Sequence, residues 1–363
     1  LSAILATGCS NYKQHKDNQE PNLNLAAPIP NNWSNDIDLN STYEVAMKGW
    51  VREFNNAKIT LIAQTVIANN QDLKIAANNV KAAEASARKA GADLNPTANL
   101  KLDNQTKGNF DQSDTTNSVG ASIDISWEAD IWGKLSASEA SATSDFQASK
   151  EDYIAARESL IAQAVKAYLL AIEAYQQKQI SLDAKDSYEK DLEITQAFFE
   201  AGSKTEQDVS ISKANLAAAE DNLAQSENGY KESLRSLELL LGQYPSGEYA
   251  IEDSFPFEPQ IISAGVPSDI LENRPDIRSA ERQVASAFNA TTMAKAAKLP
   301  SIALTSNIGG SSDDLNNLAD PTNLFWNLAG NLLTPLFDSG ALQDNVEIAD
   351  SNQKAAIAAY QSA

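Results

Sequence analysis

Long stretches of the chain combine a helical spacing of apolar positions with an absence of helix-breaking residues. Residues 134–201 contain neither glycine nor proline, which predicts one helix over about 133–201, on the order of 100 Å long. Gly202-Ser203 interrupts this pattern, and a second helix is predicted over about 204–241. Two long helices joined by so short a turn must run antiparallel. The turn is therefore predicted to form the tip of a helical hairpin.

A strict alternation of apolar and polar residues predicts a strand over about 118–129. One face would carry the apolar residues Val119, Ala121, Ile123, Ile125 and Trp127. The opposite face would carry small or polar residues, which are Gly120, Ser122, Asp124, Ser126 and Glu128. This length suits a tilted membrane-spanning strand with an aromatic residue near one end, but a strand of a soluble sandwich also alternates.

Three further segments are predicted to be strands, over about 97–107, 301–309 and 324–336. The loops that join the strands in pairs are rich in Asn, Asp, Ser and Gly, as external loops often are. Four strands cannot close a barrel around a channel, and lipid tolerates no open sheet edge. A barrel in a membrane would therefore require several chains, and three chains would supply twelve strands.

The second half of the chain repeats the first. The matches that carry most weight involve Pro, Gly, Asp and Tyr, and they pair Asp72 with Asp276, Pro96 with Pro300, Gly133 with Gly340 and Tyr153 with Tyr360. The offset is 204 residues for the first two pairs and 207 for the last two, a difference that a hairpin loop can absorb. The first copy continues to about Leu241, so we expect the second copy to be truncated and this sequence to be a fragment.

A single cysteine, Cys9, follows the mainly apolar and small residues 1–8. The arrangement resembles the end of a bacterial lipoprotein signal peptide, in which the cysteine becomes the lipidated first residue of the mature chain. Ala6 stands where that pattern prefers leucine, and an incidental buried thiol is the alternative. Lipidation would remove residues 1–8. No cofactor is expected apart from this covalent lipid.

These patterns together predict four regions. Residues 1–8 would be the remnant of a signal peptide, and residues 9–40 a lipidated polar segment. Residues 41–265 would form the first structural repeat, which ends in an equatorial loop over 242–265. Residues 266–363 would form the truncated second repeat.

Composition and charge exclude several classes of function. The chain has 363 residues, 49 acidic against 28 basic residues and a formal net charge of −21, so its surface repels nucleic acid. After the first residues, no stretch of about 18 apolar residues is long enough for a transmembrane helix. With one histidine and one cysteine, the sequence shows no metal-site spacing, phosphate loop or nucleophile elbow, and an enzyme is not expected.

Four segments resemble the outer-membrane factor (TolC-like) family, and most closely the lipoprotein branch that serves resistance-nodulation-division (RND) pumps. They are Val266–Glu281 with its Asn-Arg-Pro-Asp sequence, Ala294–Ser301, the Pro-Leu-Phe-Asp-Ser-Gly sequence at 335–340, and Trp127–Lys134. The resemblance extends from about Trp50 to the end of the chain. It implies a mainly α fold with some β-structure, in which long antiparallel helices form an α-helical barrel. It also implies a homotrimer with a twelve-stranded transmembrane β-barrel in the bacterial outer membrane, reaching into the periplasm.

The family resemblance also implies a role for the predicted tip. Gly202, Ser203 and Asp208 match the periplasmic end at which the family contacts its adaptor, a membrane fusion protein, and narrows its pore. Asp208 occupies the acidic position of that tip. The alternative for Asp208 is a structural role, because an acidic residue in the first turn is stabilised by the helix dipole.

The predicted function is that of the outer-membrane channel subunit of a tripartite efflux system. It would conduct drugs or other small toxic compounds passively from the periplasm to the exterior, driven by an inner-membrane RND pump. Ser122, Asp124, Ser126 and Glu128 would line a wet lumen that favours cations, and the apolar face of the same strand would contact lipid. A conduit for type I protein secretion would share the fold and differ in cargo. A soluble coiled-coil scaffold would explain the helices but not the alternation.

Overall fold

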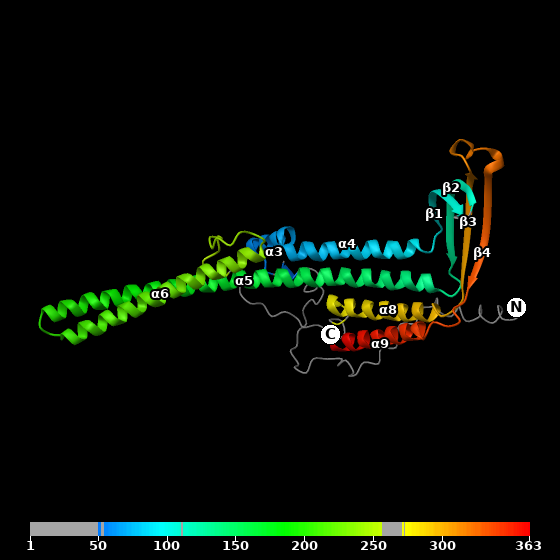
Figure 1. Cartoon of the computed structure of the whole chain (residues 1–363). Coiled ribbons are helices and arrows are strands. Elements are labelled where there is room, and N and C mark those ends of the chain that lie inside the picture. The colour runs from blue at the N-terminus through cyan, green and yellow to red at the C-terminus, as the bar shows by residue number, and fades with distance from the viewer. Residues whose placement is uncertain (1–49, 52–53, 110–111, 256–270, 272) are drawn as a thin grey trace. The chain divides into compact units, whose positions relative to one another are not determined.

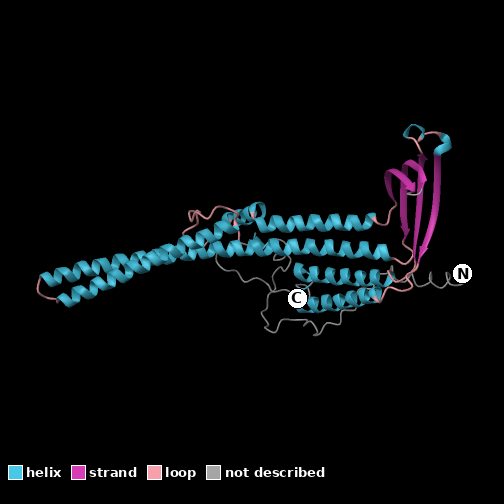
Figure 2. Ribbon diagram, viewed as in Figure 1, coloured by secondary structure: helices cyan, strands magenta, loops and turns pink. Residues whose placement is uncertain are grey.

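The computed structural model describes residues 50–51, 54–109, 112–255, 271 and 273–363. Across these residues the chain is mainly helical with one four-stranded antiparallel sheet, which confirms the predicted fold class (Figures 1 and 2). Contacts divide the described residues into two compact units. One contains residues 79–151 and 275–363, and the other contains residues 50–78 and 152–274. Cys9 and the predicted segments 1–8 and 9–40 lie outside the described residues.

The sheet belongs to the first unit. Its strands are β1 (Thr97–Asn109), β2 (Gln112–Ala129), β3 (Ser301–Ser312) and β4 (Leu324–Leu333), paired in the order β1-β2-β3-β4. Each half of the chain supplies one hairpin, and β2 of the first half pairs with β3 of the second. Strands β1 and β4 are the two edges of the sheet.

Strands β2, β3 and β4 differ from their predicted bounds. The β1–β2 ladder runs through the predicted loop, with Lys107 opposite Thr116, so β2 starts before residue 118. Backbone groups make the ladder, so polar residues can continue it. The loop after β3 contains two 3₁₀ turns, Leu315–Asn317 and Pro321–Asn323. Strand β4 ends before Pro335, which has no N–H group to donate to a ladder.

The helices of the first unit show the internal repeat. Helices α4 (Gln71–Ala92, with residues 79–92 in this unit) and α8 (Pro275–Ala296) both have 22 residues. Helices α5 (Lys134–Glu200, with residues 134–151 in this unit) and α9 (Ala341–Ser362) both start directly after a glycine with positive φ.

An aspartate stabilises each of these two helix starts. Asp130 accepts hydrogen bonds from the backbone N–H groups of Leu135 and Ser136, both at 2.9 Å. Asp338 accepts from Leu342 N–H at 2.7 Å and from Gly340 N–H at 3.0 Å. These bonds from Leu342 and Gly340 hold the pKa of Asp338 below its ordinary value. The two halves therefore repeat a strand–turn–helix unit with the same chemistry.

The second unit is built on α3 (Ala57–Asn69), residues 152–200 of α5, and α6 (Glu206–Leu240). Its core is apolar and includes Ile59, Ile62, Tyr168, Ile172 and Leu237, all with no exposed surface. Burial raises the pKa of Tyr168 to about 12, and the negative charge of Glu252 contributes to this rise. The Tyr168 hydroxyl donates a hydrogen bond to Glu252 Oε2 at 3.2 Å. Among the described helices, none combines the length and apolar composition of a membrane span.

Candidate functional site

The register of the sheet sorts the side chains onto two faces. Asp124 lies opposite Asn99 on β1 and Asn307 on β3, and Asn307 lies opposite Asn327 on β4. Directly paired residues of antiparallel strands point to the same side. The predicted polar residues Ser122, Asp124, Ser126 and Glu128 therefore share one face with three asparagines. Their predicted role in a lumen is not tested by this arrangement.

Hydrogen bonds and ion pairs hold several side chains of the polar face. Ser122 Oγ donates to Asp124 Oδ1 at 2.9 Å, and Ser126 Oγ lies 2.8 Å from Thr97 Oγ1. Glu128 Oε1 lies 2.5 Å from Lys134 Nζ, at the start of α5. Glu128 thus has a cationic partner, whereas in the part of the chain that the structure describes Asp124 forms no ion pair. Of the four predicted polar positions, Asp124 carries the charge that is left unbalanced.

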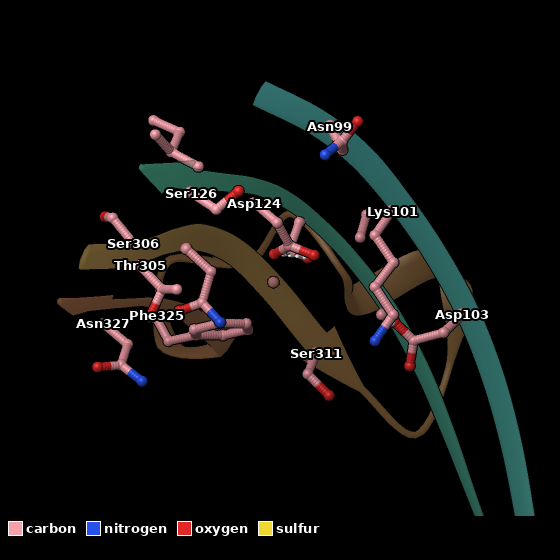
Figure 3. A pocket seen from close by; sticks show the side chains of 16 residues that line it. Asn99, Lys101, Asp103, Asp124, Ser126, Thr305, Ser306, Ser311, Phe325 and Asn327 are labelled. Atoms are coloured by element: carbon pink, nitrogen blue, oxygen red, sulfur yellow. Dashed lines mark hydrogen bonds and ion pairs between the residues drawn. The ribbon is translucent and has the colours of Figure 1, made fainter. Parts of the chain in front are cut away.

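A concave pocket of about 440 Å³ lies on the polar face (Figure 3). Its lining comes from all four strands and includes Asn99, Asp124, Thr305, Asn327 and Phe325. Phe325 lies opposite Gly309 on the polar face. Sequence reasoning missed it, because β4 reads Leu-Phe-Trp-Asn-Leu and is apolar on both faces at that end.

The opposite face of the sheet is apolar and exposed. Val119, Ala121, Ile123, Ile125 and Trp127 share it, as the register requires. Leu100 is 72% exposed, Leu102 is 73% exposed and Trp326 is 77% exposed. An apolar surface of this extent marks contact with a membrane or another chain, since water-facing strands bear polar residues. The register places side chains from all four strands on this face.

The tip of the α5–α6 hairpin lies in the second unit (Figure 1). Gly202 has φ of 76°, and the N–H groups of Gly202 and Ser203 bond to the carbonyls of Phe199 and Phe198. This is a Schellman motif at the end of α5, in which the N–H groups of a left-handed residue and of the residue after it donate to the last carbonyls of the helix. Gly202 and Ser203 are exposed. Both predicted tip residues therefore form the turn itself.

Asp208 lies in the first turn of α6 and forms a capping box with Thr205. Its Oδ2 accepts from Thr205 N–H and Thr205 Oγ–H, both at 2.7 Å. These hydrogen bonds to Thr205, backbone first and then side chain, hold the pKa of Asp208 below its ordinary value. Asp208 therefore has a structural role as a capping residue, which differs from the helix-dipole stabilisation weighed from sequence. Its contact with an adaptor stays a prediction.

Besides Asp208, a second carboxylate has a structural role in the second unit, and the sequence did not predict it. Glu238 of α6 is 3% exposed and accepts four hydrogen bonds from residues 246–249, between 2.7 and 3.0 Å long. Burial opposes its ionisation, but the donors from Gly247, Ser246, Glu248 and Tyr249 outweigh it and hold the pKa of Glu238 below its ordinary value. Glu238 lies on a helix and its donors on a loop, so no local motif marks it. It fixes the loop that follows α6.

Comparison with known proteins assigns the family. The family model described as outer membrane efflux protein matches residues 62–243 and 266–363. The chain belongs to this family. CusC, a cation efflux system protein of Escherichia coli O6:H1, is 27% identical over 365 residues, covering 99% of this chain and 77% of CusC. OpmQ, a pyoverdine export outer membrane protein of Pseudomonas aeruginosa, is 29% identical over 333 residues, covering 87% of this chain and 69% of OpmQ.

A solved outer membrane channel has the same fold. The Campylobacter jejuni CmeC outer membrane channel has a TM-score of 0.85 with 25% identity, covering 94% of this chain and 76% of CmeC. This outer membrane efflux protein is therefore an outer-membrane channel component of an efflux system, as predicted from sequence. Its outer-membrane location is also confirmed. The family comprises transport proteins rather than enzymes.

Proposed function

We propose that three copies of this chain form one channel whose barrel contains twelve strands. The observation that carries the proposal is the sheet, which has a polar face, an exposed apolar face and two open edges in one chain. Open edges in lipid leave backbone groups without hydrogen bonds, so β1 of one copy must pair with β4 of the next. The single-chain sheet is then one third of a closed wall.

The polar face lines the lumen in this proposal, and the apolar face contacts lipid. Ser122, Asp124 and Ser126 bring hydroxyl and carboxylate oxygens to the water-filled side. Leu102 and Trp326, on the other face, are the kind of side chains that acyl chains accommodate. Because Lys134 balances Glu128, the preference for cations comes mainly from Asp124 and weakens at high salt.

The tip of the α5–α6 hairpin contacts a periplasmic adaptor, and an inner-membrane RND pump supplies the energy. The exposed turn at Gly202 and Ser203 offers the docking surface, and Asp208 sets the geometry of the first turn beside it. The cargo class is drugs or other small toxic compounds. CusC is named for cations and OpmQ for pyoverdine, so family membership alone does not fix the cargo. Cys9 carries the lipid, as the pattern of residues 1–9 indicates.

Neighbouring cysteine substitutions test the orientation of the sheet. Asp124→Cys and Ile123→Cys are matched variants, since the two residues are adjacent on β2 and lie on opposite faces. In intact outer membranes, a charged maleimide should label position 124 and leave position 123 unmodified, because the reagent travels through water. Equal labelling at both positions, or labelling reversed between them, would overturn the assignment of the lumen.

A further inference from the structure

We propose that the polar face of the sheet carries a binding site for organic ammonium ions that bear an aromatic group, built around Asp124, Asn307 and Phe325. The proposal rests on the proposed function, because it requires this face to line the lumen. Each chain would contribute one such site to the channel wall. Cargo or inhibitors of this class would pause there on their way out.

The pocket has the size of a small-molecule site. Its volume of about 440 Å³ lies within the range of about 300–1,000 Å³ that such sites occupy. Its lining combines three asparagines, several hydroxyl groups, two carboxylates, one lysine and one phenyl ring (Figure 3). Lys101 Nζ lies 3.7 Å from Asp103 Oδ1, so this lysine is paired at the β1 side of the pocket. The second carboxylate, that of Asp124, has no such partner among the described residues.

Asn307 supplies an acceptor that the protein itself does not use. Its Oδ1 is buried and has no hydrogen-bond partner. A buried acceptor without a donor costs free energy, so a rotation of the Asn307 side chain that lets a ligand donate to its oxygen is favoured. Asp124 lies directly opposite on β2, which brings the two side chains within about 5 Å of each other at Cβ. The Asp124 carboxylate beside the unpartnered side-chain oxygen of Asn307 favours a cationic ligand group with more than one N–H.

A primary ammonium fits this pair of acceptors better than a metal ion does. It donates three hydrogen bonds and carries the charge that balances Asp124. A metal ion requires a larger set of converging oxygen or nitrogen ligands. In the described ranges, no group of three His, Cys, Asp or Glu residues is placed to hold one. The donor set therefore favours an organic cation.

Phe325 supplies the second half of the site. Its ring is 41% exposed and projects on the polar face, opposite Gly309, which has no side chain to cover it. By strand spacing, its Cβ lies on the order of 10 Å from that of Asp124. An aryl-alkyl amine can place its ammonium at Asp124 and its ring beside Phe325 within this span. Aromatic rings stack in this way, and a cation near the phenyl face is also attracted.

Single-channel recording of the full-length protein in planar bilayers tests the site, with 4-phenylbutylamine as the probe. We expect concentration-dependent block of the current. Asp124→Asn should weaken the block at least about tenfold, because a hydrogen bond to a charged group is lost. Phe325→Leu should weaken it about threefold. Asp320→Asn is the matched control, since Asp320 is exposed, makes no side-chain capping bond and lies in the β3–β4 loop outside the pocket.

Two ligand controls separate the parts of the site. Butylamine lacks the ring and 4-phenylbutanol lacks the charge, so both should block much less than the probe. Equal block by either control, an unblocked open channel, or full block in Asp124→Asn would overturn the site and leave the channel function standing. Absence of any current from the wild-type protein would overturn both proposals. Open-channel conductance and oligomer mass show that each variant has assembled.

Discussion

At the scale of single residues, the carboxylate of Glu238 organises the loop that follows α6. Four donors from residues 246–249 converge on a side chain that is 3% exposed. An amide in its place would direct an NH₂ group at backbone donors. We expect Glu238→Gln to destabilise this contact by about 1–3 kcal/mol. Hydrogen exchange at Gly247, Glu248 and Tyr249 should accelerate, whereas the exposed Glu232→Gln should leave these rates unchanged.

The same carboxylate predicts a pH dependence. Because the pKa of Glu238 is lowered in the folded protein, its contribution to stability is complete above the unfolded value of about 4.3. The contribution is lost as the pH falls through the lower folded value. The exchange rates of wild type and Glu238→Gln should therefore differ at pH 7 and converge at strongly acidic pH. A difference that persists unchanged at acidic pH would show that ionisation is not the cause.

Asp208 at the tip allows the structural and the docking roles to be separated. Asp208→Ala removes the acceptor of both Thr205 hydrogen bonds and should fray the first turn of α6. Asp208→Asn keeps a capping oxygen but removes the charge. If charge at the tip matters to the adaptor, Asp208→Asn should lower efflux in cells while the helix start stays protected from hydrogen exchange. Normal efflux with Asp208→Asn would restrict Asp208 to capping.

At the scale of elements, we expect substitution by alanine to have different effects at two glycines of the sheet. A Cβ at Gly309 would lie 2.3 Å from the carbonyl oxygen of Ala121 and 2.8 Å from Ser122 Cβ. A Cβ at Gly330 would meet only Leu304 Cδ2, at 3.5 Å, which is ordinary contact. Gly309→Ala should therefore disturb the β2–β3 pairing, whereas Gly330→Ala should be tolerated.

The difference between the glycine variants can be measured by gel electrophoresis of unboiled samples. The measured quantity is the amount of protein that runs as an intact oligomer. We expect a large loss of assembled protein for Gly309→Ala and wild-type amounts for Gly330→Ala. The β2–β3 pairing joins the two halves of the repeat, so the assembly of the wall depends on it. Equal assembly of both variants would mean that the sheet relaxes around position 309.

The elements differ in how far the sequence predicts them. The absence of glycine and proline over 134–201 specifies α5 almost to its ends, because such residues are what stop helices. The strict alternation of 119–128 specifies both faces of β2. The extension of β2 back to Gln112 was not predictable, since its polar residues join the ladder through backbone groups. The acceptor at Asn307 and the loop contact of Glu238 arise from tertiary pairing, which leaves no local pattern.

At the scale of the whole molecule, the repeat and the sheet are the grounds for proposing that this outer membrane efflux protein acts as an assembly. Each half supplies one hairpin and one helix that follows it, and each of these helices starts with a glycine of positive φ and an aspartate that accepts hydrogen bonds from the first turn. One chain leaves two sheet edges and an apolar face exposed. Copies of the chain that pair edge to edge satisfy the open edges, and lipid around the closed wall covers the apolar face.

Single-channel conductance of the full-length protein in planar bilayers, with its mass in detergent measured alongside, tests the central claim most directly. We predict the mass of a trimer and a current that prefers cations at low salt. Lower cation preference is expected for Asp124→Asn, because this carboxylate has no ion-pair partner among the described residues. A monomer or dimer that stays in water without detergent and carries no current would contradict the proposed channel.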